Sequence, residues 1–326
     1  MAKFIEEVEN GKRPVAPCYP ERARCPELVQ YCVTATSVLL MLAGSARGND
    51  LLQDFQPSER TSPFGKVSKV VFSTGIVDLR PNALVYSPPG LMRDLHFAEP
   101  VWVIGYKSTV IDRHGNPPLV NYLCHTFFGD QKVVQRQDQR MRAVYSDGFT
   151  PEVWLPEGYG LPMTPHDDLH WMPMFNNRDA NPATVEMNIE VTVIRQKDLV
   201  KPLRRVYSTL RSVQVPHLFY VEPKRHQQQT TFPLTFSGRI HFIGTHIHPH
   251  GESIELFNVT RGQRVWMGSM KKDAAKREVA MDTYSSAQGY PVKAGEVFRI
   301  TSVYNNPTSR PIDAMAAVFL FYSLEN

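Results

Sequence analysis

The 326-residue chain lacks several features that would point to common classes of protein. Its net charge is only +4 and it has no block of Lys and Arg, which argues against nucleic acid as its main partner. It has no glycine-rich phosphate loop and no G-x-S-x-G elbow, so neither a nucleotide-binding fold nor a serine hydrolase is supported. It also has no long helical stripe, and its 26 prolines would disrupt a mostly helical protein.

Cysteine is scarce in the body of the chain. Three of the four cysteines fall within the first 32 residues, and Cys124 is the only one that follows. A lone thiol cannot form an internal disulfide. In an oxidising compartment we would therefore expect Cys124 to be buried or to be held by a partner such as a metal ion.

An apolar segment over residues 28–46 predicts export of the chain. Two arginines precede it, its apolar core at 33–43 is short, and it ends in small residues, which is the order typical of an export signal. A membrane-spanning helix would need about 20 predominantly apolar residues. We therefore expect residues 1–46 to be an extension with an export signal, and the mature protein to be secreted or periplasmic with no membrane association. A buried helix of the folded domain is the alternative.

The remainder of the chain has the pattern of strands. In residues 184–194, five apolar residues alternate with polar ones, which is typical of a half-buried antiparallel strand. Seven other segments show strand periodicity or β-branched enrichment and are separated by turn sequences: 66–73, 100–111, 239–248, 253–260, 263–270, 296–304 and 316–324. The sequence therefore predicts an all-β chain.

A charged stretch over residues 196–211 marks a domain boundary near residue 200. It follows one strong strand and precedes a new β region, and we interpret it as a solvated linker, with a binding patch as the alternative. Each side is long enough for a sandwich. The sequence thus predicts two consecutive antiparallel, jelly-roll-like β-sandwich domains, at 66–198 and 199–326, after a linker at 47–65.

The histidines carry most of the functional information. Six of the eleven lie between residues 217 and 250, and His246 and His248 are two apart on a predicted strand. Residues two apart on a strand face the same side, so both imidazoles can point into one space. Imidazole is the commonest protein ligand for copper, zinc, iron and nickel. We therefore predict a metal site at His246 and His248, with a hydrogen-bonded surface strand as the alternative.

Residues after the histidine pair bear on which metal is bound. Glu252 gives the pair a pattern that also occurs in cupin barrels, but no histidine follows His250, so a cupin lacks its last imidazole. Met315 lies at the head of an apolar strand. Most methionines only fill the core. Two imidazoles with one thioether nevertheless favour copper, because soft sulfur stabilises Cu(I) and imidazole accepts either oxidation state.

Residues 201–326 resemble the C-terminal domain of the copper type II, ascorbate-dependent monooxygenases, the family of peptidylglycine α-hydroxylating and dopamine β-monooxygenases. The matching motifs are Thr245–Gly251, Pro291–Gly295, Ser302–Asn306 and Asp313–Ala316. In that family the His-x-His pair and the methionine hold the copper that activates dioxygen. The resemblance implies this role for His246, His248 and Met315. It also implies ascorbate as reductant and a small-molecule or peptide substrate with an activated C–H bond.

Residues 66–198 resemble the first domain of that family less closely. Where the family has an adjacent pair of histidines, this chain has Cys124 and His125, and Met174 falls at the position of the third ligand. The resemblance implies a second copper site at His125, Met174 and Cys124, or a lost site whose residues simply pack. The family also uses several disulfides, which this chain lacks after residue 46. We therefore expect a divergent member.

Two functions follow from the resemblance. The first is a copper-dependent monooxygenase that hydroxylates a C–H bond at the His/His/Met copper. The second is a non-enzymatic copper-binding protein on the same fold, a carrier or sensor, because a rewritten first site would no longer supply the second electron. A cupin-like metal protein and a purely structural β protein are further alternatives.

Overall fold

A computed structural model describes residues 54–85, 93–112, 114–116, 122–130, 140–167, 169–215 and 217–325. All of them belong to one compact unit, residues 48–326. Every regular element in these ranges is a strand, which confirms the all-β prediction. Within the same ranges, no helix has the length and apolar character needed to cross a membrane. The predicted export segment at 28–46 lies outside the described residues.

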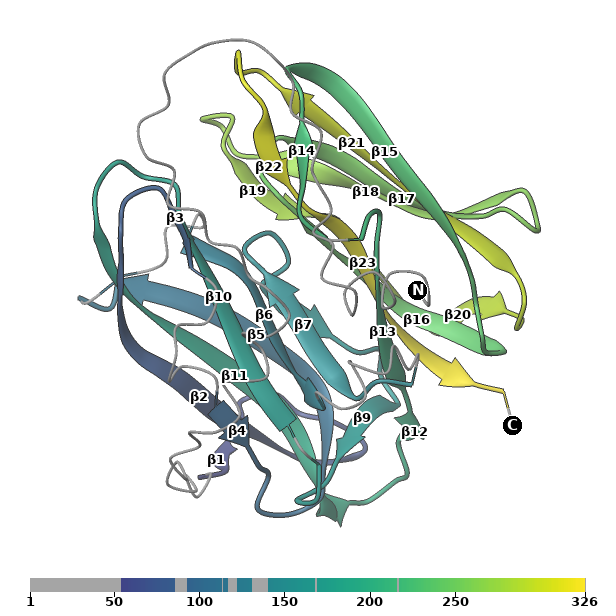
Figure 1. Cartoon of the computed structure of the whole chain (residues 1–326). Coiled ribbons are helices and arrows are strands. Elements are labelled where there is room, and N and C mark those ends of the chain that lie inside the picture. Colours follow the sequence, from purple (N-terminus) through teal and green to yellow (C-terminus); the bar gives the residue numbers. More distant parts are fainter. Residues whose placement is uncertain are drawn as a thin grey trace, which may run out of the picture. The chain divides into compact units, whose positions relative to one another are not determined.

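The strands up to residue 205 form two sheets, which we call the N-terminal sheets (Figure 1). The larger has the order β1-β2-β11-β5-β9-β12, with β8 beside β5. Its strands are β1 (Gln56–Pro57), β2 (Gly65–Leu79), β5 (Val101–Asp112), β8 (Glu152–Trp154), β9 (Tyr159–Met163), β11 (Ala183–Leu199) and β12 (Arg204–Arg205). The smaller has the order β3-β10-β6-β7, with β4 beside β10. Its strands are β3 (Ala83–Val85), β4 (Arg93–Leu95), β6 (Leu123–Asp130), β7 (Ala143–Asp147) and β10 (Leu169–Asn177).

The later strands form three sheets, which we call the C-terminal sheets. Their orders are β13-β23-β16-β20, β15-β21-β17-β18-β19 and β14-β22. The first has β13 (Tyr207–Ser212), β16 (Gly238–Ile247), β20 (Tyr284–Val292) and β23 (Ala316–Leu324). The second has β15 (Lys224–Pro233), β17 (Gly251–Asn258), β18 (Gln263–Lys272), β19 (Glu278–Met281) and β21 (Val297–Asn306), and the third has β14 (Phe219–Val221) and β22 (Ile312–Ala314).

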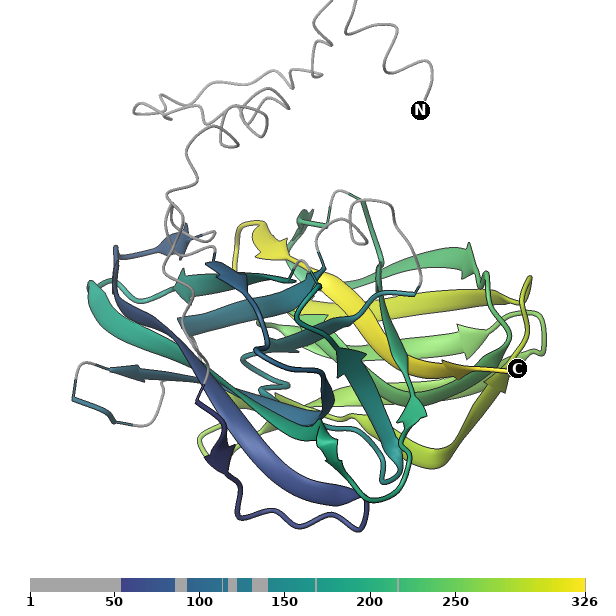
Figure 2. The ribbon, with the colours of Figure 1, turned by 90° about the horizontal axis from the view of Figure 1, so that it is seen from below.

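Each sheet takes all its strands from one side of residue 206. Figures 1 and 2 show the purple-to-teal strands and the green-to-yellow strands as two groups. In the described part of the chain, one isolated β-bridge, between Met141 and Ser208, pairs backbone of the first group with backbone of the second. The sheets thus change near the predicted boundary, while one compact unit runs across it.

The alternation in β11 shows why these segments become strands. Val185, Met187, Ile189, Val191 and Val193 are at most 2% exposed, and the polar residues between them point to the opposite face. β11 pairs antiparallel with β2 on one side and β5 on the other. This is the half-buried antiparallel strand that the period of two predicts.

The two hydrophobic cores share side chains across the boundary. The core of the N-terminal sheets also contains Phe242 of β16 and Phe319 and Phe321 of β23. The core of the C-terminal sheets contains Phe149, from the loop after β7. Burying one such ring contributes about 1.5–3 kcal/mol. The contact between the two groups of sheets is therefore part of the folded core.

Candidate metal centre

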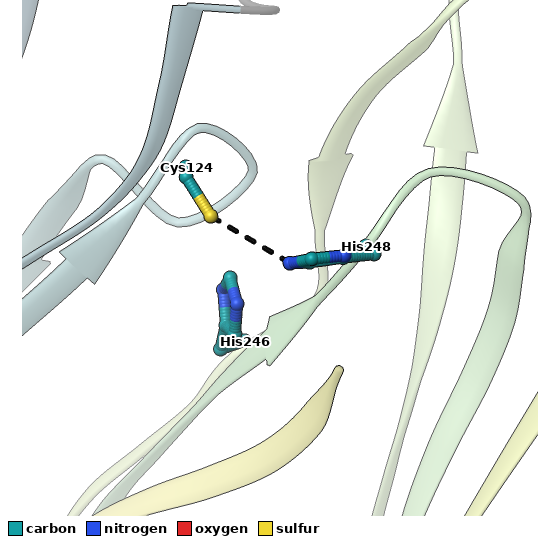
Figure 3. A group of neighbouring side chains, drawn as sticks. All are labelled: Cys124, His246 and His248. Atoms are coloured by element: carbon teal, nitrogen blue, oxygen red, sulfur yellow. Dashed lines mark hydrogen bonds between the residues drawn. The ribbon is translucent and has the colours of Figure 1, made fainter. Parts of the chain in front are cut away.

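Three buried side chains converge where β6 meets the end of β16 (Figure 3). Cys124 comes from β6, His246 from β16 and His248 from the residue after β16 ends. One ligand atom from each lies within 4.8 Å of the other two. The Cys124 Sγ lies 3.6 Å from the His248 Nε2, and the two imidazole rings are 5.1 Å apart and nearly perpendicular.

A β-bulge brings Cys124 to this place. In the pairing of β6 with β10, His125 lies opposite Met174 and Leu123 lies opposite Phe175, so Cys124 is the extra residue. A bulge sets two residues opposite one and redirects a side chain. The Cys124 Sγ accordingly lies 3.4 Å from the His125 Nδ1, although neighbours on a regular strand point to opposite faces.

The pairing of β16 with β23 positions the two histidines. His246 lies opposite Ala317, whose small side chain leaves room for the imidazole ring. The His248 backbone N–H donates to the Met315 carbonyl at 3.1 Å, which continues this pairing past the end of β16. Gly244 is needed nearby, because a Cβ there would overlap the Phe319 ring. Both imidazoles are thereby held on one side of the strand.

A carboxylate orients each imidazole: Asp147, which is buried, and Asp313, which is partly exposed. The His246 Nδ1 donates to the Asp147 Oδ2 at 3.0 Å, and the His248 Nδ1 donates to the Asp313 Oδ2 at 2.8 Å. These bonds assign the proton of each neutral ring to Nδ1 and leave Nε2 as the free nitrogen beside Cys124. Histidines that bind metals usually donate their other N–H to a carboxylate in this way.

The two carboxylates are themselves held in place. The Asp147 Oδ1 accepts the backbone N–H groups of Phe149 and Thr150, at 2.9 and 2.6 Å. Asp313 accepts a forked pair of hydrogen bonds from the Arg178 guanidinium, at 3.1 and 2.8 Å. The imidazoles therefore have little freedom to rotate.

One buried nitrogen of the cluster has no hydrogen-bond partner. The His246 Nε2 is fully enclosed and forms no hydrogen bond with the described part of the chain. Leaving a buried polar atom unsatisfied costs about 1–3 kcal/mol. A ring nitrogen of His246 lies within 4.8 Å of ligand atoms of Cys124 and His248, so coordination of an ion held by the three residues would satisfy the Nε2 atom.

Burial sets the protonation of the cluster. Burial lowers the pKa of His248, although the hydrogen bond to Asp313 partly opposes this, and burial lowers the pKa of His125 well below its ordinary value. Burial, reinforced by the charge of Asp147, raises the pKa of the Cys124 thiol. Burial would raise the pKa of Asp313, but its hydrogen bonds to His248 and Arg178 hold it well below the ordinary value. Burial thus favours the neutral form of His125 and His248, as metal binding requires, and the thiol would lose its proton to a bound metal.

The space between the side chains fits an ion. The hollow lined by the cluster, Phe149 and Arg178 has a volume of about 20 Å³, which is room for a single water-sized particle. Ligand atoms around a tetrahedral zinc ion lie about 3.5 Å apart, close to the 3.6 Å between the Cys124 Sγ and the His248 Nε2. The same atoms resemble a thiol–imidazole–carboxylate triad, but so small a hollow leaves no space for an organic substrate.

The other predicted ligands lie around the same place. The His125 ring stacks on Tyr145 and lies 4.8 Å from the His246 ring. Met174 is buried on β10 opposite His125. Met315 is buried beside His248 through its backbone carbonyl, but among the described residues it is not one that lines the hollow. Cys124 therefore belongs to the cluster with His246 and His248, and His125 lies next to it.

Asp147, Asp313 and Arg178 were not predicted from the sequence. Asp147 and Asp313 lie 99 and 65 residues from the histidines that they orient. Asp313 belongs to a motif quoted for its methionine, and Asp147-Gly148 reads as an ordinary turn. Only the folded arrangement shows that both carboxylates face imidazoles.

Comparisons with known proteins identify no family. No family model matches the chain, and no curated protein matches it. Solved structures similar to the chain include the major capsid protein P2 of bacteriophage PM2, at 10% identity and a TM-score of 0.34, covering 77% of this chain and 98% of that one. The cowpea mosaic virus top component is 8% identical with a TM-score of 0.34, covering 87% and 94%. The STIV MCP is 9% identical with a TM-score of 0.32, covering 80% and 97%. Similarity this low carries no argument about function.

The prediction of a copper type II monooxygenase is wrong. Neither a family model nor a curated protein supports that family, and none of the solved structures named above belongs to it. The predicted small-molecule or peptide substrate falls with the activity, and the carrier, sensor and cupin-like alternatives have no support.

Proposed function

We propose that this chain is a structural β-sandwich protein in which one transition-metal ion fastens the N-terminal sheets to the C-terminal sheets. Cys124 would supply a thiolate from the N-terminal sheets, and His246 and His248 would supply two imidazoles from the C-terminal sheets. The observation that carries the proposal is the cluster of Cys124, His246 and His248, in which the buried His246 Nε2 has no hydrogen-bond partner among the described residues.

The proposal includes the division into two consecutive sandwich domains at 66–198 and 199–326. Its support is that each sheet of the described residues takes its strands from one side of residue 206, which puts the change of sheets after β12 (Arg204–Arg205), a few residues beyond the predicted boundary. A metal ion bound across this boundary would cross-link the two groups of sheets, and we call this cross-link the metal clasp. Because the unfolded chain has no preformed site, the free energy of metal binding would add to the free energy of folding.

The ligand set limits the choice of ion. One thiolate with two imidazoles suits zinc or Cu(I), and buried sites that are closed by protein ligands are typical of structural zinc. The His125 Nδ1 lies 3.4 Å from the Cys124 Sγ, but the three residues whose ligand atoms all lie within 4.8 Å of one another are Cys124, His246 and His248. The expectations of copper with ascorbate, of Met315 and Met174 as ligands, and of export remain predictions.

Metal analysis of the purified protein tests the proposal. We expect one zinc or copper ion per chain by mass spectrometry, and a thiolate-to-cobalt charge-transfer band when Co²⁺ is added to the metal-free protein. Cys124→Ser should abolish the band, and His246→Ala should lower the metal content. His226→Ala is the matched control, because His226 is exposed on β15 and outside the cluster. Full metal content in both site variants, or none in the wild type after reconstitution, would refute the clasp.

A further inference from the structure

A second cleft lies where the segment joining the two groups of sheets runs over the larger N-terminal sheet. Its volume is about 500 Å³, within the range of about 300–1,000 Å³ typical of small-molecule sites. Its lining combines the apolar side chains of Phe64 and Pro202 and the ring of Tyr159 with two cations, Lys201 and Arg204, and Ala287 also lines it. Residues from both groups of sheets therefore contribute to it.

Backbone hydrogen bonds fix the frame of this cleft. β12 pairs in parallel with β9, which sets Arg204 beside Tyr159. The Arg204 N–H donates to the Gly158 carbonyl at 2.8 Å, and the Val200 N–H donates to the Phe64 carbonyl at 2.9 Å. The segment that carries Lys201 and Arg204 is therefore tied to the sheet on both sides of the cleft.

Side-chain contacts fix the interior. The Tyr159 hydroxyl donates to the Ala287 carbonyl at 3.0 Å, and the Arg204 guanidinium donates to that hydroxyl at 3.3 Å. The Tyr159 ring also lies 3.9 Å from the ring of the buried His241. Arg204 is thus steered toward the cleft, and one hydrogen bond uses one of its five N–H donors.

The charge of the cleft favours an anion. Lys201 and Arg204 form no ion pair with another described residue, and Glu157 is the one acidic residue among those lining the cleft. Arg239 adds a third cation close by, since it donates to the Gln288 and Gly289 carbonyls next to Ala287. A planar guanidinium beside an ammonium is the arrangement that carboxylates and phosphates bind.

We propose that this cleft binds a small organic anion with a flat apolar group. The phosphate or carboxylate end contacts Lys201 and Arg204, and the flat group packs between Phe64 and Pro202. The charged stretch at 196–211, interpreted above as a solvated linker, then supplies the recognition residues. This site does not depend on the metal ion at Cys124.

Calorimetric titration with phenyl phosphate tests this site. Phenyl phosphate should bind the wild-type protein at least about tenfold more tightly than inorganic phosphate or phenol, because only phenyl phosphate offers both the anion and the ring. Arg204→Gln should weaken binding about tenfold or more, the usual effect of losing a hydrogen bond to a charged group. Lys201→Gln, at an exposed position, should also weaken binding.

Arg205→Gln is the matched control, because Arg205 is the neighbouring exposed arginine of β12 and does not line the cleft. It should leave the affinity unchanged within about twofold, and His246→Ala should as well. Three results would overturn the proposal: no heat of binding at millimolar phenyl phosphate, equal affinity for inorganic phosphate, or an equal loss in Arg205→Gln. None of them bears on the metal clasp, which the metal content tests separately.

Discussion

Removing the metal ion should destabilise the whole described unit. The ligands come from strands about 120 residues apart in the sequence, and no site exists until the two groups of sheets have folded together. When free zinc is present at 1,000 times the dissociation constant, the bound ion stabilises the folded state by about 4 kcal/mol. For a unit as large as residues 48–326, each kcal/mol shifts the melting temperature by about 2 °C. The metal-free protein should therefore melt about 8 °C lower.

Differential scanning calorimetry of the zinc-loaded and chelator-treated protein measures this shift. The shift should grow with the logarithm of free zinc, should return when zinc is added back, and should be absent in Cys124→Ser. His226→Ala should show the full shift. A melting temperature that does not depend on zinc in a protein shown to bind one ion would refute the reasoning, because that ion would then not join the two groups of sheets.

Three other predictions follow from the contacts described above. Asp313→Asn should weaken metal binding about 10–100-fold in a competition with a chelating dye, because the carboxylate orients His248. Asp273→Asn, which removes the carboxylate of an ion pair outside the cluster, should leave the affinity unchanged. Equal metal affinities of the two variants would show that Asp313 has no such role. Burial lowers the pKa of His241, so the stability contributed by its neutral ring is complete above the unfolded pKa of about 6.5 and is lost as the pH falls through that value. The urea midpoint should therefore fall between pH 7 and pH 5, and it should fall less steeply in His241→Asn. Parallel pH curves of the wild type and the variant would exclude this role of His241. Phe128→Ala should lower the free energy of unfolding, measured in urea, by about 3–5 kcal/mol, because the Phe128 ring is fully buried. Ile76→Ala should change it by under about 0.5 kcal/mol, because Ile76 is 70% exposed. A small effect of Phe128→Ala would place the Phe128 ring outside the packed core.

The sequence supports the secondary structure well, because a strand's period of two is a local property. The alternation in β11 and the patterns of seven other segments predict eight of the strands that the structure contains, whereas β6, β10 and β15, among others, are not predicted. The same local reasoning places His246 and His248 on one side of β16. Which strands pair, and how the sheets are ordered, depends on contacts between distant residues, which a single sequence does not reveal.

The arrangement around the histidines could be predicted only in part. Cys124 faces them because of a bulge, and a pattern that assumes regular alternation assigns it to the opposite side from His125. Asp147 comes from a strand about 100 residues earlier. The incorrect family assignment has a related cause, because it depends on short motifs that strand geometry and ordinary turns can also produce. Such motifs carry information about neighbours along the chain and little about how far apart two sites lie.

The exchange of aromatic rings between the two cores limits how this protein can be divided. The core of the N-terminal sheets contains three rings from the C-terminal sheets, those of Phe242, Phe319 and Phe321. The core of the C-terminal sheets contains the ring of Phe149, which follows β7 of the N-terminal sheets. A fragment cut near residue 206 would expose these rings to water and leave matching gaps in its counterpart. We expect either fragment alone to aggregate, and the two fragments to regain the folded structure when they are refolded together. The chain therefore folds as one cooperative unit, although its sheets form two groups.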